Sequence, residues 1–171
     1  LNRIDLGTAD KLCVAALCLA LHSEDFCLLE FGSAFTACLA VTDGKIVDAL
    51  SGTSGPIGWG SGGAWDGELA YLLGPVNKHD LFRGGLRDLP EGIDPAELLA
   101  ESCLRAIFSL AFLAGTNVER ILQTGRLLET EPDLMANVEH KLRYHWDTER
   151  GGSLPNTWVK QAAQGAALLA D

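Results

Sequence analysis

Several features that would point to particular classes of protein are missing from this sequence of 171 residues. Basic residues are scarce, because 13 Lys and Arg stand against 23 Asp and Glu and leave a net charge of −10. Nucleic acids and anionic membrane surfaces are bound through clustered Lys and Arg, so this balance argues against both partners. The longest apolar run near the start, residues 12–21, is far too short to span a bilayer.

Paired cysteine motifs and a secretory signal are missing as well. The five cysteines form no C-x-x-C pair and lie inside apolar runs, where a free thiol behaves as a small hydrophobic side chain. His140 and His145 lie five residues apart, which does not place two metal ligands on one face of a helix. No cationic segment with a cleavage site stands at the start. We therefore expect reduced structural thiols, a cytoplasmic protein and no metal site made of side chains.

The residues that are present suit one folded domain. Apolar residues make up 47% and charged residues 21% of a chain long enough to bury a substantial core. The chain begins at Leu1, and its only methionine is Met135. We therefore expect residues 1–171 to be a single domain of a longer protein.

The pattern of apolar residues predicts three consecutive strands over residues 26–31, 35–41 and 45–50. Asp43-Gly44 lies between the last two and is a strong hairpin signal, because both residues tolerate a positive φ. The turn between the first two strands, Gly32-Ser33-Ala34, consists of small residues. Such a turn lets backbone N–H groups approach an anion such as a phosphate.

The remaining elements are mostly helical. Helices are expected over residues 9–21, 95–114, 132–144 and 158–170, and a further strand over residues 120–123. Thr8 is a candidate N-cap of the first helix, and Asp94-Pro95 is a strong start signal for the longest, which should end at Gly115. Gly165 would allow close packing of the last helix. Strands followed by helices, with a later strand between long helices, predict an α/β layer architecture.

Two stretches leave alternatives open. The many glycines from Ser51 to Gly63 predict a surface loop, which could line a ligand cleft or act as a flexible connector. Asp66 and Glu68 follow at the start of a short predicted helix. They could bind a substrate or metal, or serve only as the acidic first turn of that helix. Within the loop expected over residues 75–94, His79 and Arg83 could touch a ligand or be solvated.

Together these pieces resemble the second domain of the actin-like ATPase superfamily, which includes sugar kinases, acetate and butyrate kinases and chaperone ATPases. Members carry a second phosphate-binding hairpin of the pattern Asp-x-Gly-x-x-x-Thr. Residues 30–36 match it, with Glu30 in place of the Asp and Ala34 in place of a glycine. Thr124-Gly125-Arg126 is similar to the adenosine loop, and residues 161–170 to the final connecting helix. The fold implied is an α/β, ribonuclease H-like, actin-type ATPase domain.

Three segments are similar to a largely archaeal family of predicted butyrate kinases, namely residues 2–13, 32–37 and 162–167. Residues 52–58 and 66–68 are each similar to the Asp-Gly-Glu-Gly-Pro loop of butyrate kinases, and both correspondences stay open.

The resemblance implies the C-terminal, nucleotide-binding half of a small-molecule kinase that uses ATP and Mg²⁺ and phosphorylates a carboxylate such as butyrate. Backbone amides of the first turn would hold the phosphates, and the loop after the later strand would border the adenosine. The implied nucleotide residues are Gly32, Ser33, Ala34, Thr36, Gly125 and Arg126. The implied acceptor residues are Gly52, Thr53, Asp66 and Glu68.

The superfamily builds its active site between two domains. The first phosphate loop, and the acidic residue that organises Mg²⁺, are therefore expected in an N-terminal domain outside this chain, which would be its main partner. The sequence also leaves a homodimer open. Two alternatives compete with the kinase: a non-catalytic ATP-dependent conformational module, as in chaperones and cell-division proteins, and a structural domain whose hairpin binds nothing.

Overall fold

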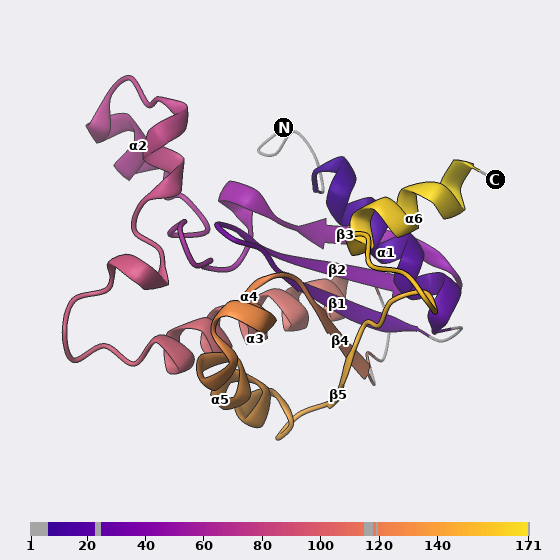
Figure 1. Ribbon diagram of the computed structural model, residues 1–171. Coiled ribbons are helices and arrows are strands. Elements are labelled where there is room, and N and C mark those ends of the chain that lie inside the picture. Colours follow the sequence, from indigo (N-terminus) through magenta and orange to yellow (C-terminus); the bar gives the residue numbers. More distant parts are fainter. Residues whose placement is uncertain (1–6, 23–24, 115–117, 119, 171) are drawn as a thin grey trace.

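A computed structural model describes residues 7–22, 25–114, 118 and 120–170, and a five-stranded sheet forms its centre (Figure 1). The strands are β1 (Phe26–Phe31), β2 (Thr36–Thr42), β3 (Lys45–Leu50), β4 (Arg120–Thr124) and β5 (Asp147–Arg150). Their order is β3-β2-β1-β4-β5. β2 runs antiparallel to both its neighbours, whereas β4 runs parallel to both β1 and β5. The expected α/β architecture is confirmed.

Helices cover both faces of the sheet. They are α1 (Ala9–Leu21), α2 (Gly67–Leu73), α3 (Pro95–Ala114), α4 (Leu127–Thr130), α5 (Pro132–Leu142) and α6 (Gln161–Ala170). α1 and α6 lie on one face and α3 and α5 on the other, whereas α2 stands away from the sheet (Figure 1). None of the helices in the described ranges combines the length and apolarity needed to cross a membrane.

The alternation of side chains along β1 explains the two cores. Cys27, Leu29 and Phe31 pack with α3 and α5, whereas Phe26 and Leu28 pack with α1. Every residue of β1 is buried, so the strand reads as a continuous apolar run interrupted only by Glu30. By the same alternation Glu30 lies on the α1 face.

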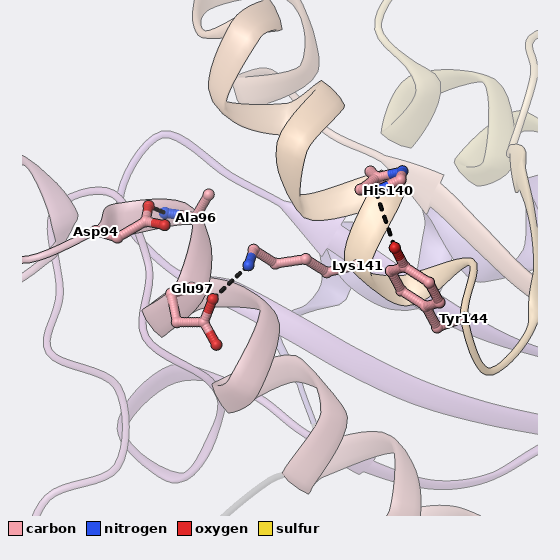
Figure 2. Close-up of polar contacts among 6 residues, drawn as sticks. All are labelled: Asp94, Ala96, Glu97, His140, Lys141 and Tyr144. Atoms are coloured by element: carbon pink, nitrogen blue, oxygen red, sulfur yellow. Dashed lines mark hydrogen bonds and ion pairs between the residues drawn. The ribbon is translucent and has the colours of Figure 1, made fainter.

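Several local predictions are confirmed. Asp43 and Gly44 have φ values of 51° and 70° in the β2–β3 hairpin. Asp94 caps α3, because its Oδ1 accepts a hydrogen bond of 2.9 Å from the Ala96 N–H. Figure 2 shows this cap beside the ion pair between Glu97 of α3 and Lys141 of α5, which ties the two helices together. Tyr144 and His140 also share a hydrogen bond at the end of α5 (Figure 2).

Other local predictions need correction. The Thr8 side chain makes no capping hydrogen bond to α1, and its hydroxyl donates instead to the Asp10 carboxylate. The last helix, α6, begins at Gln161 rather than at residue 158, and α5 ends at Leu142 rather than at residue 144. Neither α4 nor β5 was predicted from the sequence. The predicted stop of α3 at Gly115 lies outside the described residues.

The crossing of α1 and α6 depends on Gly165, as the sequence predicted. A Cβ atom at this position would fall on the carbonyl group of Cys13 in α1. The two helix backbones therefore approach more closely than any side chain would allow.

Candidate functional site

The carboxyl ends of the parallel strands β1 and β4 meet at one edge of the sheet, with Glu30 opposite Thr124. Beyond β1 the chain turns, and the Gly32 N–H donates to the Phe35 carbonyl at 3.0 Å. Beyond β4, Gly125 has a φ of 104°, and a Cβ atom there would lie 2.7 Å from the Phe31 backbone nitrogen. The predicted adenosine loop therefore lies against the last residue of β1, directly before the first turn, at the kind of edge where α/β sheets form ligand crevices.

Unpartnered polar atoms concentrate at this edge. Within the described residues, buried side-chain oxygens of Thr36, Gln123 and Thr124 have no hydrogen-bond partner. Each of these residues is only 1% exposed. Thr124 lies on the α1 face of the sheet, and Thr36 and Gln123 lie on the opposite face. Leaving a buried polar group unsatisfied costs about 1–3 kcal/mol, so each of these groups calls for a specific explanation. A polar ligand bound at this edge would provide it.

Glu30 does have one charged neighbour, because its Oε2 forms an ion pair with Lys11 of α1. The Lys11 ammonium also lies 3.2 Å from the Asp10 carboxylate. The Lys11 and Glu30 side chains are 13% and 10% exposed. A Cβ atom on Gly32 would lie 3.4 Å from both Lys11 Nζ and Glu30 Oε2. The ion pair therefore lies directly against the first turn.

Burial and charge act against each other in this ion pair. Burial alone would lower the pKa of Lys11, but the carboxylates of Glu30 and Asp10 outweigh it and raise that pKa above its ordinary value. For Glu30 burial is the larger effect, and it raises the pKa of the carboxyl although Lys11 opposes the change.

The glycine-rich loop packs tightly against the first turn. The Gly60 N–H donates to the Ala34 carbonyl at 3.0 Å, and a Cβ atom on Gly58 would overlap the Ala34–Phe35 backbone. On its other side the loop is fixed to α3, since the Ile57 N–H donates to Ser102 Oγ at 2.9 Å. The loop is thus a packed support for the turn, which replaces the flexible connector considered from the sequence.

The predicted acceptor residues lie at the start of the glycine-rich loop and at the start of α2. Gly52 and Thr53 belong to a 3₁₀ turn after β3, and the Trp65 N–H donates to the Thr53 carbonyl at 3.3 Å. Asp66 caps α2 by accepting from the N–H groups of Glu68 and Leu69, and Glu68 is exposed. Capping therefore accounts for Asp66 without a ligand, which was the structural alternative.

A cavity of about 540 Å³ lies between the glycine-rich loop and α2. Its walls are mainly apolar, and Asp80 and Arg83 provide its charges. Phe82, which precedes the lining residue Arg83, packs edge-on against Phe35 with ring centroids 5.1 Å apart. The cavity is lined by Gly62, Ala64, Trp65, Leu69, Leu73, Pro75, Val76, Asp80, Arg83 and Gly84. Arg83, which the sequence marked, is among them, whereas His79 and the four predicted acceptor residues are not.

Sequence reasoning missed Lys11 and Gln123, and it named Thr124 only as part of the segment similar to the adenosine loop. A signal for Lys11 was available, because a cation in the first turn of a helix is opposed by the helix dipole. Lys11 is also the only basic residue of an otherwise mostly apolar helix. The roles of Gln123 and Thr124 depend on their register with β1, which a sequence pattern does not give.

Comparison with known protein families assigns the chain to one of them. The model of a family described as "Protein of unknown function (DUF1464)" matches residues 1–171. The chain belongs to this family. No curated protein matches the sequence.

Solved structures similar to this chain include acetate and propionate kinases. Acetate kinase from Entamoeba histolytica has a TM-score of 0.61 and 13% identity, over 78% of this chain and 44% of its own. Porphyromonas gingivalis acetate kinase has a TM-score of 0.60 and 14% identity, over 93% of this chain and 53% of its own. A propionate kinase from Francisella tularensis subsp. tularensis SCHU S4 has a TM-score of 0.56 and 18% identity, over 80% and 43%.

This likeness concerns the fold alone, since the identities are low. It confirms the predicted fold class, an actin-type α/β domain like that of acetate kinase. The chain spans about half the length of these kinases.

Proposed function

We propose that this chain binds ATP at the carboxyl ends of β1 and β4 and is the nucleotide-binding half of a kinase for a small carboxylic acid such as butyrate. The observation that carries the proposal is the edge itself, where Gly125 lies against the last residue of β1 and buried oxygens of Thr36, Gln123 and Thr124 lack hydrogen-bond partners. The carboxylate kinases that share the fold support the same assignment.

The first turn would hold the phosphates. The Gly32 N–H already donates to Phe35, so the role of Gly32 would be to leave room for a phosphate oxygen. In the described part of the chain, the N–H groups of Ser33 and Ala34 donate to no protein acceptor and remain for the ligand. The unpartnered Thr36 hydroxyl would add a further donor. Amide donors of this kind stabilise a transferring phosphoryl group by positioning and charge.

The loop after β4 would border the adenosine. Gly125 brings this loop against β1, and Arg126 follows it with an exposed side chain. Arg126 makes no ion pair with any residue in the described ranges. A planar, unpaired guanidinium is suited to stacking on a flat base.

Mg²⁺ would accompany the nucleotide and neutralise charge on its phosphates. The part of the chain that the structure describes holds no group of three or more His, Cys, Asp or Glu side chains arranged for a metal ion. Glu30, the carboxylate beside the turn, is paired with Lys11, so phosphate oxygens and water would supply the ligands of the ion on this side of the cleft. The fit is therefore to a nucleotide-bound metal.

The acceptor would occupy the apolar cavity beside the turn. Its lining suits a short aliphatic chain, and Arg83 makes no ion pair within the described residues. A guanidinium binds a carboxylate through two parallel hydrogen bonds. A monocarboxylic acid with a few carbons therefore fits the cavity better than a sugar, which would need many polar partners.

We further propose that a domain outside residues 1–171 forms the opposite wall of the cleft. The similar kinases are about twice as long as the part that this chain covers.

All five cysteines are free thiols, which supports a reducing compartment such as the cytoplasm.

The test is a titration of the full-length protein with Mg-ATP, followed by thermal unfolding and by an assay of butyrate-dependent ADP formation. A ligand that binds only the folded state stabilises it by about 2.7 kcal/mol at one hundred times its Kd. We expect stabilisation by Mg-ATP and ADP formation that requires the carboxylate. Stabilisation without carboxylate-dependent ADP would favour the conformational module, and no stabilisation at all would contradict ATP binding.

A further inference from the structure

Lys11 occupies an unfavourable position for a lysine. It lies in the first turn of α1, where the helix dipole opposes a positive charge, and its side chain is only 13% exposed. Its ion pair with Glu30 does not justify this position by stability alone. Replacing a buried ion pair by apolar side chains is often neutral or stabilising, because both charges lose their hydration. The position therefore points to a role beyond folding.

The geometry indicates what this role is. Only the absent side chain of Gly32 separates the Lys11 ammonium from the first turn, since a Cβ atom there would lie 3.4 Å from Nζ. The proposed phosphate donors, the N–H groups of Ser33 and Ala34, follow directly in the same turn. An ammonium group held at this point faces the place where the net negative charge of a bound polyphosphate would be greatest.

The groups around Lys11 allow it to change partners. Thr124 lies opposite Glu30 in the sheet register and on the same face, and its hydroxyl is buried and unpartnered. If the ammonium turns toward a phosphate, the Thr124 hydroxyl is the available donor for the Glu30 carboxylate. Asp10 remains a second carboxylate beside Lys11.

We propose that Lys11 binds the terminal phosphate of the nucleotide, with Glu30 and Asp10 holding its ammonium in place while no nucleotide is bound. The proposal rests on the proposed function and adds the residue that makes the site selective for polyphosphates. Glu30 and the phosphate then compete for the Lys11 ammonium. When the ammonium binds the phosphate, the Thr124 hydroxyl donates a hydrogen bond to Glu30.

The test compares Kd values for ATP and for adenosine, without Mg²⁺, in the full-length protein and its variants. A hydrogen bond between charged groups contributes enough that K11M should weaken ATP binding on the order of tenfold to a hundredfold, and leave adenosine binding unchanged. K11R keeps the charge and should recover most of the loss. K45M is the matched control, because Lys45 is an exposed lysine at the start of β3.

A second variant separates binding from folding. E30Q removes the competitor of the phosphate, so it should tighten Mg-free ATP binding several-fold and leave adenosine binding unchanged. If Lys11 only closes an ion pair, K11M lowers the melting temperature without changing the ratio of the two Kd values, and E30Q does not tighten ATP binding. Either result overturns the proposal, and E30Q decides the case if K11M is too unstable to titrate.

The outcomes also distinguish a failure of the proposed nucleotide site from a failure of the role proposed for Lys11. Wild-type protein that binds neither ATP nor adenosine overturns the proposed function and this inference together. Wild-type protein that binds both, with an unchanged ratio in K11M, overturns only the role of Lys11.

Discussion

At the end of β4, Gly125 combines a φ of 104° with a backbone that lies against Phe31. A side chain at this position is strained by the backbone conformation and would also push β1 and β4 apart. Gly44 has a similar φ of 70° but open space around it. Comparing substitutions at Gly125 and Gly44 therefore separates the cost of a positive φ from the cost of steric overlap with neighbouring backbone.

We expect G125A to lower the free energy of unfolding by about 3 kcal/mol or more, and G44A by about 1 kcal/mol, because only G125A adds overlap to strain. Urea unfolding of both variants measures the difference. G125A should also lose binding of Mg-ATP. Equal stability of the two variants would contradict the close contact between Gly125 and the Phe31 backbone.

The ion pair between Lys11 and Glu30 makes a prediction about pH. In K11M, Glu30 remains a buried carboxyl whose pKa is raised above its ordinary value of 4.5, with no cation to oppose the rise. A carboxyl with a raised pKa binds its proton more tightly in the folded state. Its contribution to stability is therefore present below pH 4.5 and is lost as the pH rises through the raised pKa.

We expect K11M to become progressively less stable than wild type above this pH, by about 3 kcal/mol at neutrality, since an uncompensated buried charge is left behind. The double variant K11M/E30Q should lack this pH dependence. Chemical denaturation at several pH values measures both. A K11M profile parallel to that of wild type would mean that Glu30 is not buried beside Lys11.

The nucleotide residues named from the sequence lie at one edge of the structure, and their role in binding stays a prediction. The small residues of the first turn, Thr36 and the Gly125-Arg126 pair all come from segments that the structure brings to one edge. Lys11 was not found, because its importance comes from a contact with Glu30 that only the packing of α1 on the sheet creates.

Among the elements, the crossing of α1 and α6 depends most on one residue. Alanine is normally favoured over glycine in a helix by about 1 kcal/mol. At Gly165 this gain is outweighed, because the added methyl group would meet the Cys13 carbonyl. Gly67 in α2 has no atom near its hypothetical Cβ and provides a matched control.

We expect G165A to destabilise the protein by about 2 kcal/mol or more, and G67A to be neutral or slightly stabilising. Thermal unfolding of the two variants gives the comparison directly. A stabilising effect of G165A would contradict the close approach of the two helices.

Elements with strong local signals were predicted, and those that depend on distant contacts were not. The strands β1, β2 and β3 follow from apolar runs and turn residues, and α3 follows from its Asp94 cap. β5 has the sequence Asp-Thr-Glu-Arg, in which only Thr148 is buried, so it forms a strand through pairing with β4 rather than through its own pattern. The glycine-rich loop was expected at the surface, but its contacts with the first turn bury much of its backbone.

For the whole molecule, the net charge of −10 would repel a nucleotide from most of the surface. Binding at the β1–β4 edge must therefore rely on local donors, namely the free amides of the first turn and Lys11. The cavity near Arg83 is a competing location for an anion on the same chain.

The most direct test of the central claim is hydrogen–deuterium exchange of the backbone amides, with and without a non-hydrolysable Mg-ATP analogue. The account predicts new protection in residues 32–36 and 124–127, together with the first turn of α1, because these segments would enclose the phosphates and the adenosine. Protection confined to residues 62–84, or no change at the two turns with the analogue at saturation, would contradict it.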